Sequence, residues 1–147
     1  MRNYEFEESE KKILVAFLRW GVLKGLYVTE VPIGSYYPKK IDSVCIEMSD
    51  EELEHLKDFE NPTEYVQDSR LGFKQFEKRS VWLLEIKQKL DSSALGQILI
   101  YKHYFEGIYH DTILKGVGIV CKESDSMIEE VCQEYNVHVY EVPIYFF

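Results

Sequence analysis

Two short patterns in the middle of the chain carry residue types that could hold a divalent metal ion and act on a phosphodiester. The run from Val81 to Lys87 is an apolar strand that ends in Glu-x-Lys. A helical segment follows it and places Gln97 and Tyr101 one turn apart. Upstream, Asp42 supplies a carboxylate on another expected strand. Because Mg²⁺ prefers oxygen ligands, Asp42 and Glu85 are candidate ligands if their strands are neighbours.

The spacing of these residues suggests how they would divide the chemistry. Glu85 and Lys87 are two apart on a strand, so they share one face at its charged end. A metal ion held there would neutralise phosphate charge and activate a water molecule. Lys87 would orient that water or stabilise the developing negative charge. Gln97 and Tyr101 share a helix face and would brace the site or hydrogen-bond a phosphate.

Each signal also has a plainer interpretation. Glu-x-Lys is usually a surface ion pair, and a lone Asp on a strand is often a bend or edge residue. Glu47 lies on the same expected strand as Asp42 and competes with it as the second acid. Glu10 either points inward from the first helix or is a favourable charge in its first turn. Glu30 and His103 either face a groove or lie on the surface.

Length and composition favour a single intracellular domain. The chain has 147 residues, of which 46% are hydrophobic, and this is too apolar for a disordered chain. The net charge of −9 excludes a basic coat protein that binds nucleic acid nonspecifically, but it does not exclude a nuclease. The three cysteines lack metal-ligand spacing, and we expect no signal peptide or membrane span. Few Asn, abundant Lys and Glu and many Tyr weakly favour a hot habitat. The expected location is the cytoplasm, of a thermophilic prokaryote or of a viral host cell.

Periodicity and turn residues predict an α/β fold, with a mixed central sheet flanked by helices. Gly25 is expected to end the first helix. Asp91 or Ser92 is expected to cap the helix over 93–105, and Ser126 is expected to begin a capping box. In chain order, we expect a helix over 8–24, strands over 26–33 and 40–48, a helical insertion over about 50–79, a strand over 81–89, a helix over 93–105, a strand over 116–121, a helix over 126–135 and a strand over 137–142.

The helical insertion has two interpretations within the single domain over residues 1–147. It could clamp a nucleic-acid strand and stack Tyr65, Phe73 and Phe76 on bases. Alternatively, it is a helical cover that buries these aromatic side chains. The apolar tail from Ile144 to Phe147 is expected to pack on its own core or on a partner subunit.

In the order and context of these residues, the chain resembles the PD-(D/E)xK nuclease superfamily and, within it, the RecB-like branch. The matching residues are Ile41-Asp42, Glu85-Ile86-Lys87 and Gln97 to Tyr101, and Glu10 best matches the further glutamate that such families often carry on the first helix. The resemblance implies a restriction-endonuclease-like core of order αβββαβ. It also implies that Mg²⁺ or Mn²⁺ binds to Asp42, Glu85, Glu10 and the Ile86 carbonyl, with Lys87 as the catalytic lysine.

The leading hypothesis is therefore a metal-dependent deoxyribonuclease, with DNA as its substrate. The alternative is a non-catalytic nucleic-acid-binding or assembly module that keeps the nuclease fold. The stretch between Asp42 and Glu85 is longer than usual for the family, and Asp42 lacks the preceding proline. The clustered cysteines of iron–sulfur relatives are absent, so no cluster is implied. A homodimer is compatible with the acidic surface, and RNA is not separated from DNA.

Overall fold

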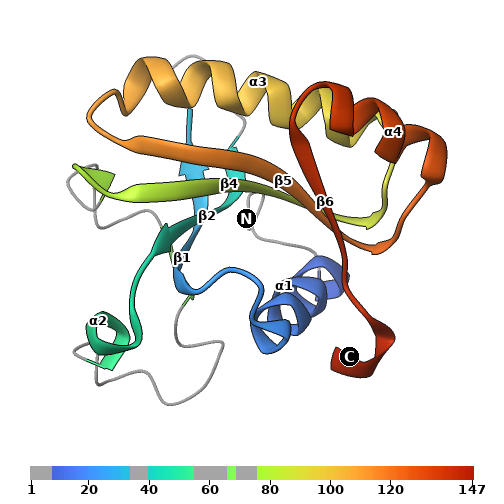
Figure 1. Cartoon of the computed structure of the whole chain (residues 1–147), viewed down its shortest axis with the longest axis horizontal. Coiled ribbons are helices and arrows are strands. Elements are labelled where there is room, and N and C mark those ends of the chain that lie inside the picture. Colours follow the sequence, from blue (N-terminus) through green and yellow to red (C-terminus); the bar gives the residue numbers. More distant parts are fainter. Residues whose placement is uncertain (1–7, 34–39, 55–65, 69–75) are drawn as a thin grey trace.

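A computed structural model of the chain describes residues 8–33, 40–54, 66–68 and 76–147. These residues form a twisted mixed sheet with helices on both faces, so the expected fold class is confirmed at this level (Figure 1). The elements are α1 (Glu8–Trp20), β1 (Gly25–Pro32), β2 (Lys40–Glu47), α2 (Asp50–Glu54), β3 (Val66–Asp68), β4 (Ser80–Lys89), α3 (Ser92–Ile108), β5 (Ile113–Glu123), α4 (Ser126–Glu134), β6 (Val137–Glu141) and the 3₁₀ helix η4 (Ile144–Phe146).

The sheet joins an antiparallel half to a parallel half. Its strand order is β3-β1-β2-β4-β5-β6. β1 pairs antiparallel with β2, and β2 pairs antiparallel with β4. β4, β5 and β6 run parallel and are connected through α3 and α4, because parallel neighbours need a crossover. β3 adds to β1 in parallel. The central strand β4 is therefore the place where the two halves meet.

Strand alternation divides the core into two layers. On β4, Leu83 packs in the layer under α3, whereas Leu84 and Ile86 pack in the layer under α1. α3 and α4 cover one face of the sheet, and α1 covers the other (Figure 1). The cysteines at positions 45, 121 and 132 are buried free thiols, as expected for Cys45 and Cys121. At the chain end, Phe146 packs near Trp20, while Ile144 and Tyr145 are each 84% exposed.

β1 bends beside the position that matters most for the site. Val28 and Val31 both pack in the layer under α3, although residues three apart on a regular strand face opposite sides. Glu30 lies between them with a φ of 56°, in the left-handed region that non-glycine residues rarely adopt. Beyond this bend, the hydroxyl of Tyr109, the C-cap of α3, donates a hydrogen bond to the Pro32 carbonyl at 3.0 Å. The end of β1 is therefore tied to the C-terminal end of α3.

Helix ends correct two details of the sequence analysis. Asp91 caps α3 as expected, and its carboxylate accepts from the Ala94 amide at 2.8 Å. The cap of α4 is Asp125, and Ser126 is already inside the helix. Helix α1 ends at Trp20 because Gly21 follows with a φ of 75°, so Gly25 opens β1 and is not a C-cap. Within the described residues, no helix is long and apolar enough to cross a membrane.

The segment predicted as a helical insertion contains a strand. Only Asp50–Glu54 is an α-helix among its described residues, and Val66–Asp68 forms β3 at the sheet edge. Its charge pattern favoured a helix, but pairing with β1 decides the conformation of Val66–Asp68. Phe76 is 1% exposed and contacts the ring of Phe105, so the cover interpretation holds for this aromatic side chain and base stacking does not. Tyr65 and Phe73 lie outside the described residues.

Two glycine substitutions test the packing of this sheet. A Cβ at Gly25 would lie 2.0 Å from the Ile46 carbonyl oxygen, whereas one at Gly96 on α3 would meet no atom within 4 Å. We expect Gly25→Ala to lower the free energy of unfolding by about 3 kcal/mol or more. Gly96→Ala should raise it by about 0.5–1 kcal/mol, because alanine favours the helix. Urea denaturation of both variants measures this, and a similar change in both would contradict the β1–β2 packing.

Candidate functional site

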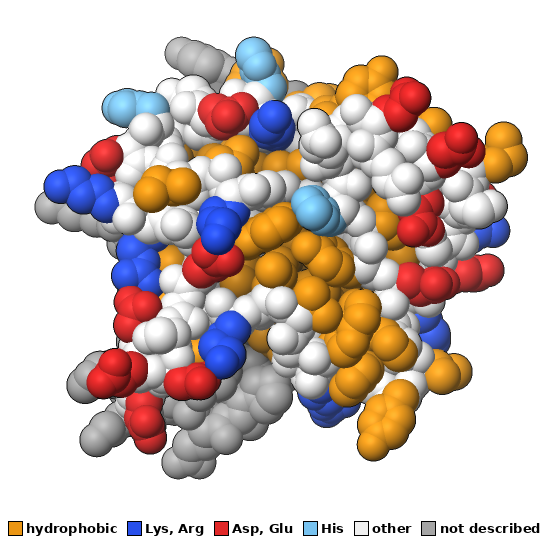
Figure 2. Space-filling model, viewed as in Figure 1, with side chains coloured by type: hydrophobic (Ala, Val, Ile, Leu, Met, Phe, Trp, Pro, Cys, Tyr) orange, Lys and Arg blue, Asp and Glu red, His pale blue; other side chains and the backbone are white. Residues whose placement is uncertain are grey.

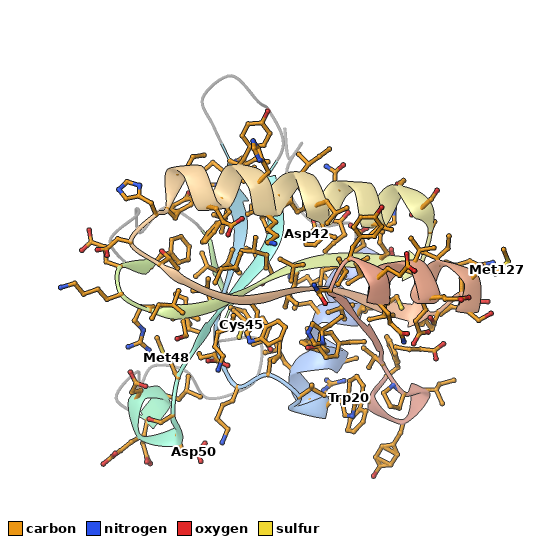
Figure 3. The ribbon with its side chains drawn as sticks, turned by 45° about the horizontal axis from the view of Figure 1, so that its top comes forward. Trp20, Asp42, Cys45, Met48, Asp50 and Met127 are labelled. Carbon is orange, nitrogen blue, oxygen red and sulfur yellow. The ribbon has the colours of Figure 1, made fainter. Side chains whose placement is uncertain are left out.

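Asp42 and Glu85 come together at the centre of the sheet. The β2–β4 register pairs Ser43 with Leu84, and the next position along places Asp42 opposite Glu85. The Asp42 side chain accepts a hydrogen bond from the Ile86 amide at 2.8 Å, which anchors it to β4. In Figure 3, Asp42 lies just beneath helix α3. The sequence predicts that these two carboxylates meet, and the strand pairing brings them side by side.

Glu85 is an acid in an environment that suits a neutral group or a bound cation. Its side chain is 7% exposed, and its Oε1 atom is buried without a hydrogen-bond partner. Burial, followed by the charge of Asp42, raises the pKa of Glu85 far above its ordinary value of 4.5. Lys87 and a hydrogen bond with Tyr101 act in the opposite direction but do not offset this. The pair therefore shares a proton or needs a positive partner.

Helix α3 covers the acid pair and contributes Gln97 and Tyr101, the two residues expected there. The Gln97 amide donates a hydrogen bond to the Tyr101 hydroxyl at 3.3 Å. Tyr101 is 3% exposed, and burial together with the charges of Glu85 and Asp42 raises its pKa well above 10.0. A tyrosine so disfavoured as an anion stays protonated and can donate to a carboxylate. Gln97 fixes the position of that hydroxyl.

Lys87 lies where the buried pair meets solvent. It is two residues beyond Glu85, and its side chain is 28% exposed. Its Nζ atom is 3.7 Å from Asp91 Oδ2, while the other oxygen of that carboxylate caps α3. Asp91 therefore links the lysine to the start of the helix. The sequence predicts Asp91 as a cap but not this second contact, because Lys87 is on a strand and the turn between β4 and α3 brings the two side chains together.

The third expected acid, Glu10, comes from another element than the pair. Glu10 is on α1, and the buried face of α1 packs against the sheet face opposite α3. Across the described parts of the chain, no three or more His, Cys, Asp or Glu side chains are grouped so that they could hold a metal ion. Ile86 contributes its amide to Asp42 and its side chain to the layer under α1. Metal binding by Glu10 and by the Ile86 carbonyl stays a prediction.

Of the competing residues, Glu47 and His103 lie away from the pair, whereas Glu30 lies beside Asp42. Glu47 is at the opposite end of β2 from Asp42, where it accepts from the Trp82 indole at 3.3 Å and pairs with Lys115. Position 30 on β1 falls opposite Asp42, since Thr29 pairs with Ser43, and Glu30 forms the bend there. His103 is an exposed residue of α3 in ring contact with Tyr104. Asp42 is thus the acid that strand pairing brings to Glu85.

No family model, no curated protein and no solved structure matches this chain. The function must therefore be argued from the buried acid pair, its lysine and the covering helix.

The raised pKa of Glu85 gives a stability prediction for the metal-free protein. Because the folded pKa exceeds the unfolded one, the native state holds a proton that the unfolded state releases above about pH 4.5. Stability should fall as pH rises through this window, by at most about 1.4 kcal/mol per pH unit. Glu85→Gln removes this dependence and should be more stable than the parent protein at pH 8.

Urea denaturation in a chelator between pH 5 and 8 measures this difference. Glu123→Gln, at an exposed acid at the end of β5, is the matched control and should follow the parent curve. Parallel curves for the parent protein and Glu85→Gln would show that Glu85 is not a protonated, buried acid.

Proposed function

We propose that this protein is a metal-dependent nuclease that hydrolyses DNA phosphodiester bonds. The observation that carries the proposal is the buried Oε1 atom of Glu85, which has no hydrogen-bond partner and belongs to a carboxyl beside Asp42. Two adjacent buried acids are costly unless a proton or a cation compensates them. A divalent cation would compensate both. A DNA substrate would also agree with the expected intracellular location.

The residues of the site fit Mg²⁺ or Mn²⁺, and each has a definable task. Asp42 and Glu85 would hold the cation, which when bound would neutralise phosphate charge and lower the pKa of a water molecule. Lys87 stands at the solvent side of the pair, where its ammonium group would stabilise the pentavalent phosphate. The Tyr101 hydroxyl, held by Gln97, would keep the Glu85 carboxylate oriented.

The order of elements adds independent support. When α2 and β3 are left out, the series α1, β1, β2, β4, α3, β5 is compatible with the αβββαβ order implied by the resemblance to PD-(D/E)xK nucleases. The acid of β2, the Glu-x-Lys of β4 and the Gln/Tyr pair of α3 occur in that order. If these residues matched the pattern by chance, we would not expect all of them to lie together between β2, β4 and the covering helix α3. The two sheet-edge strands β3 and β6 are additions to this core.

Cleavage of labelled DNA tests the proposal. With Mg²⁺ or Mn²⁺, we expect cleavage of linear single-stranded, linear duplex or circular duplex DNA, and loss of cleavage in EDTA. Glu85→Gln should abolish activity because it removes a metal ligand. Lys87→Ala should lower the rate by about 10²–10⁴-fold. Lys89→Ala is the matched control, since Lys89 is an exposed residue of the same strand, and should retain nearly the parent rate.

Binding measurements decide what a negative result means. Calorimetric titration with Mn²⁺ should detect a site that Glu85→Gln loses, whether or not the chosen nucleic acid is cleaved. Mn²⁺ binding with cleavage of RNA alone would change the substrate. Folded protein that neither binds Mn²⁺ nor cleaves any of these substrates would reject the nuclease in favour of a non-catalytic binding or assembly module.

A further inference from the structure

Among the described residues, no strand pairs with the outer edge of β6. In the sheet of the described residues, β6 pairs with β5 and is the last strand on that side. The Val142 amide donates to the Cys121 carbonyl at 2.9 Å, which sets the alternation of the backbone. In a parallel ladder, alternate residues bond to the same neighbour, so the amides and carbonyls of Val139 and Glu141 point toward the open edge. These groups form a template for one more strand.

The two faces beside this edge differ in chemistry. Val137 and Val139 belong to the layer under α3 and α4, and between α4 and β6 lies a cleft of about 320 Å³ lined in part by Glu129 and Gln133. On the opposite face, the rings of His138 and Tyr140 are stacked at 6.1 Å with planes 10° apart. An added strand would therefore meet acidic and polar groups on one face and aromatic rings on the other.

The acidic side has an excess of negative charge. Glu129 accepts from the Ser124 hydroxyl at 2.8 Å, and Glu141 accepts from the Ser124 amide at 2.9 Å, so both carboxylates converge on one residue. Residues 122–141 contain six acidic residues and one basic residue, Lys122. None of these six acids forms an ion pair with a described lysine or arginine. In Figure 2, acidic side chains gather on the right, where Figure 1 places α4, and hydrophobic side chains form a patch nearer the centre.

We infer that the β6 edge binds an extended segment of another protein in which basic and apolar side chains alternate. The segment would add a strand to β6, with its backbone on Val139 and Glu141. Because side chains of a strand alternate between faces, its lysines would reach Glu129 and Glu141 while its apolar side chains cover His138 and Tyr140. A second copy of this chain would bring like charges together, and a nucleic acid would meet carboxylates, so neither fits this edge.

A short peptide provides the test. The probe is an N-acetylated, C-amidated heptapeptide in which lysine and valine alternate, added to the ¹⁵N-labelled full chain. We expect amide shifts confined to β6 and α4, with slowed hydrogen exchange at Val139 and Glu141. Versions of the peptide with glutamate in place of lysine, or with serine in place of valine, should bind at least about tenfold more weakly.

A matched pair of charge reversals completes the test. Glu129→Lys should weaken binding of the lysine peptide by about tenfold, because it reverses a charge that lines the cleft. Glu130→Lys makes the same change at the next, exposed position of α4 and should alter binding by less than about twofold. Equal effects of the two reversals, or no shifts in β6 up to about 1 mM peptide, would overturn the inference.

Sedimentation at several protein concentrations tests whether a second copy of this chain binds the β6 edge instead. Self-association accompanied by the same β6 shifts would assign the edge to a second copy and reject the partner segment. The nuclease proposal is unaffected by either result, because its residues lie across the sheet on β2 and β4.

Discussion

Two carboxylates, Asp42 and Glu85, are forced into proximity by the pairing of neighbouring central strands. Asp42 and Glu85 are opposite each other in a sheet whose faces are both covered. At an effective dielectric constant of about 20, like charges about 4 Å apart repel by about 4 kcal/mol. In the metal-free protein this repulsion, together with burial, keeps a proton on the pair. A divalent cation bound between the two acids, as proposed, would relieve the same repulsion.

The surrounding elements hold this unfavourable pair in place. Asp42 cannot turn away easily because its carboxylate is bonded to the Ile86 amide. Tyr101 stays protonated and contacts Glu85, and Gln97 holds the hydroxyl of Tyr101. Asp91 starts α3 and also contacts Lys87, so one residue sets both the covering helix and the lysine. The site is therefore built from regular elements that also form the core, and its acids are fixed by the packing around them.

Local patterns predicted most of this arrangement, and long-range pairing decided the rest. The apolar run of β4 and the charges near its end identify Glu85 and Lys87, although the strand continues beyond them to Lys89. The distinction between Asp42 and Glu47 depended on the β2–β4 register, which no local pattern contains. Val66–Asp68 looked helical by charge but forms a strand because β1 offers an edge. The bend at Glu30 is also tertiary, since an acidic residue does not by itself indicate a left-handed backbone.

A net charge of −9 would disfavour a polyanionic substrate if the acidic residues were spread evenly over the surface. In this fold they are not spread evenly. β2 and β4 are antiparallel, so the start of β2 and the end of β4 lie at the same end of the sheet. Lys40 is two residues before Asp42 and Lys87 is two residues after Glu85, and both lysines therefore lie at that end. Positive charge thus follows the acid pair on both strands. The acids of α4 and β6 lie beyond β5, on the other side of the sheet from β2. These lysines would partly offset the negative charge that a phosphate meets at the proposed site, whereas the far edge of the sheet carries an excess of acids.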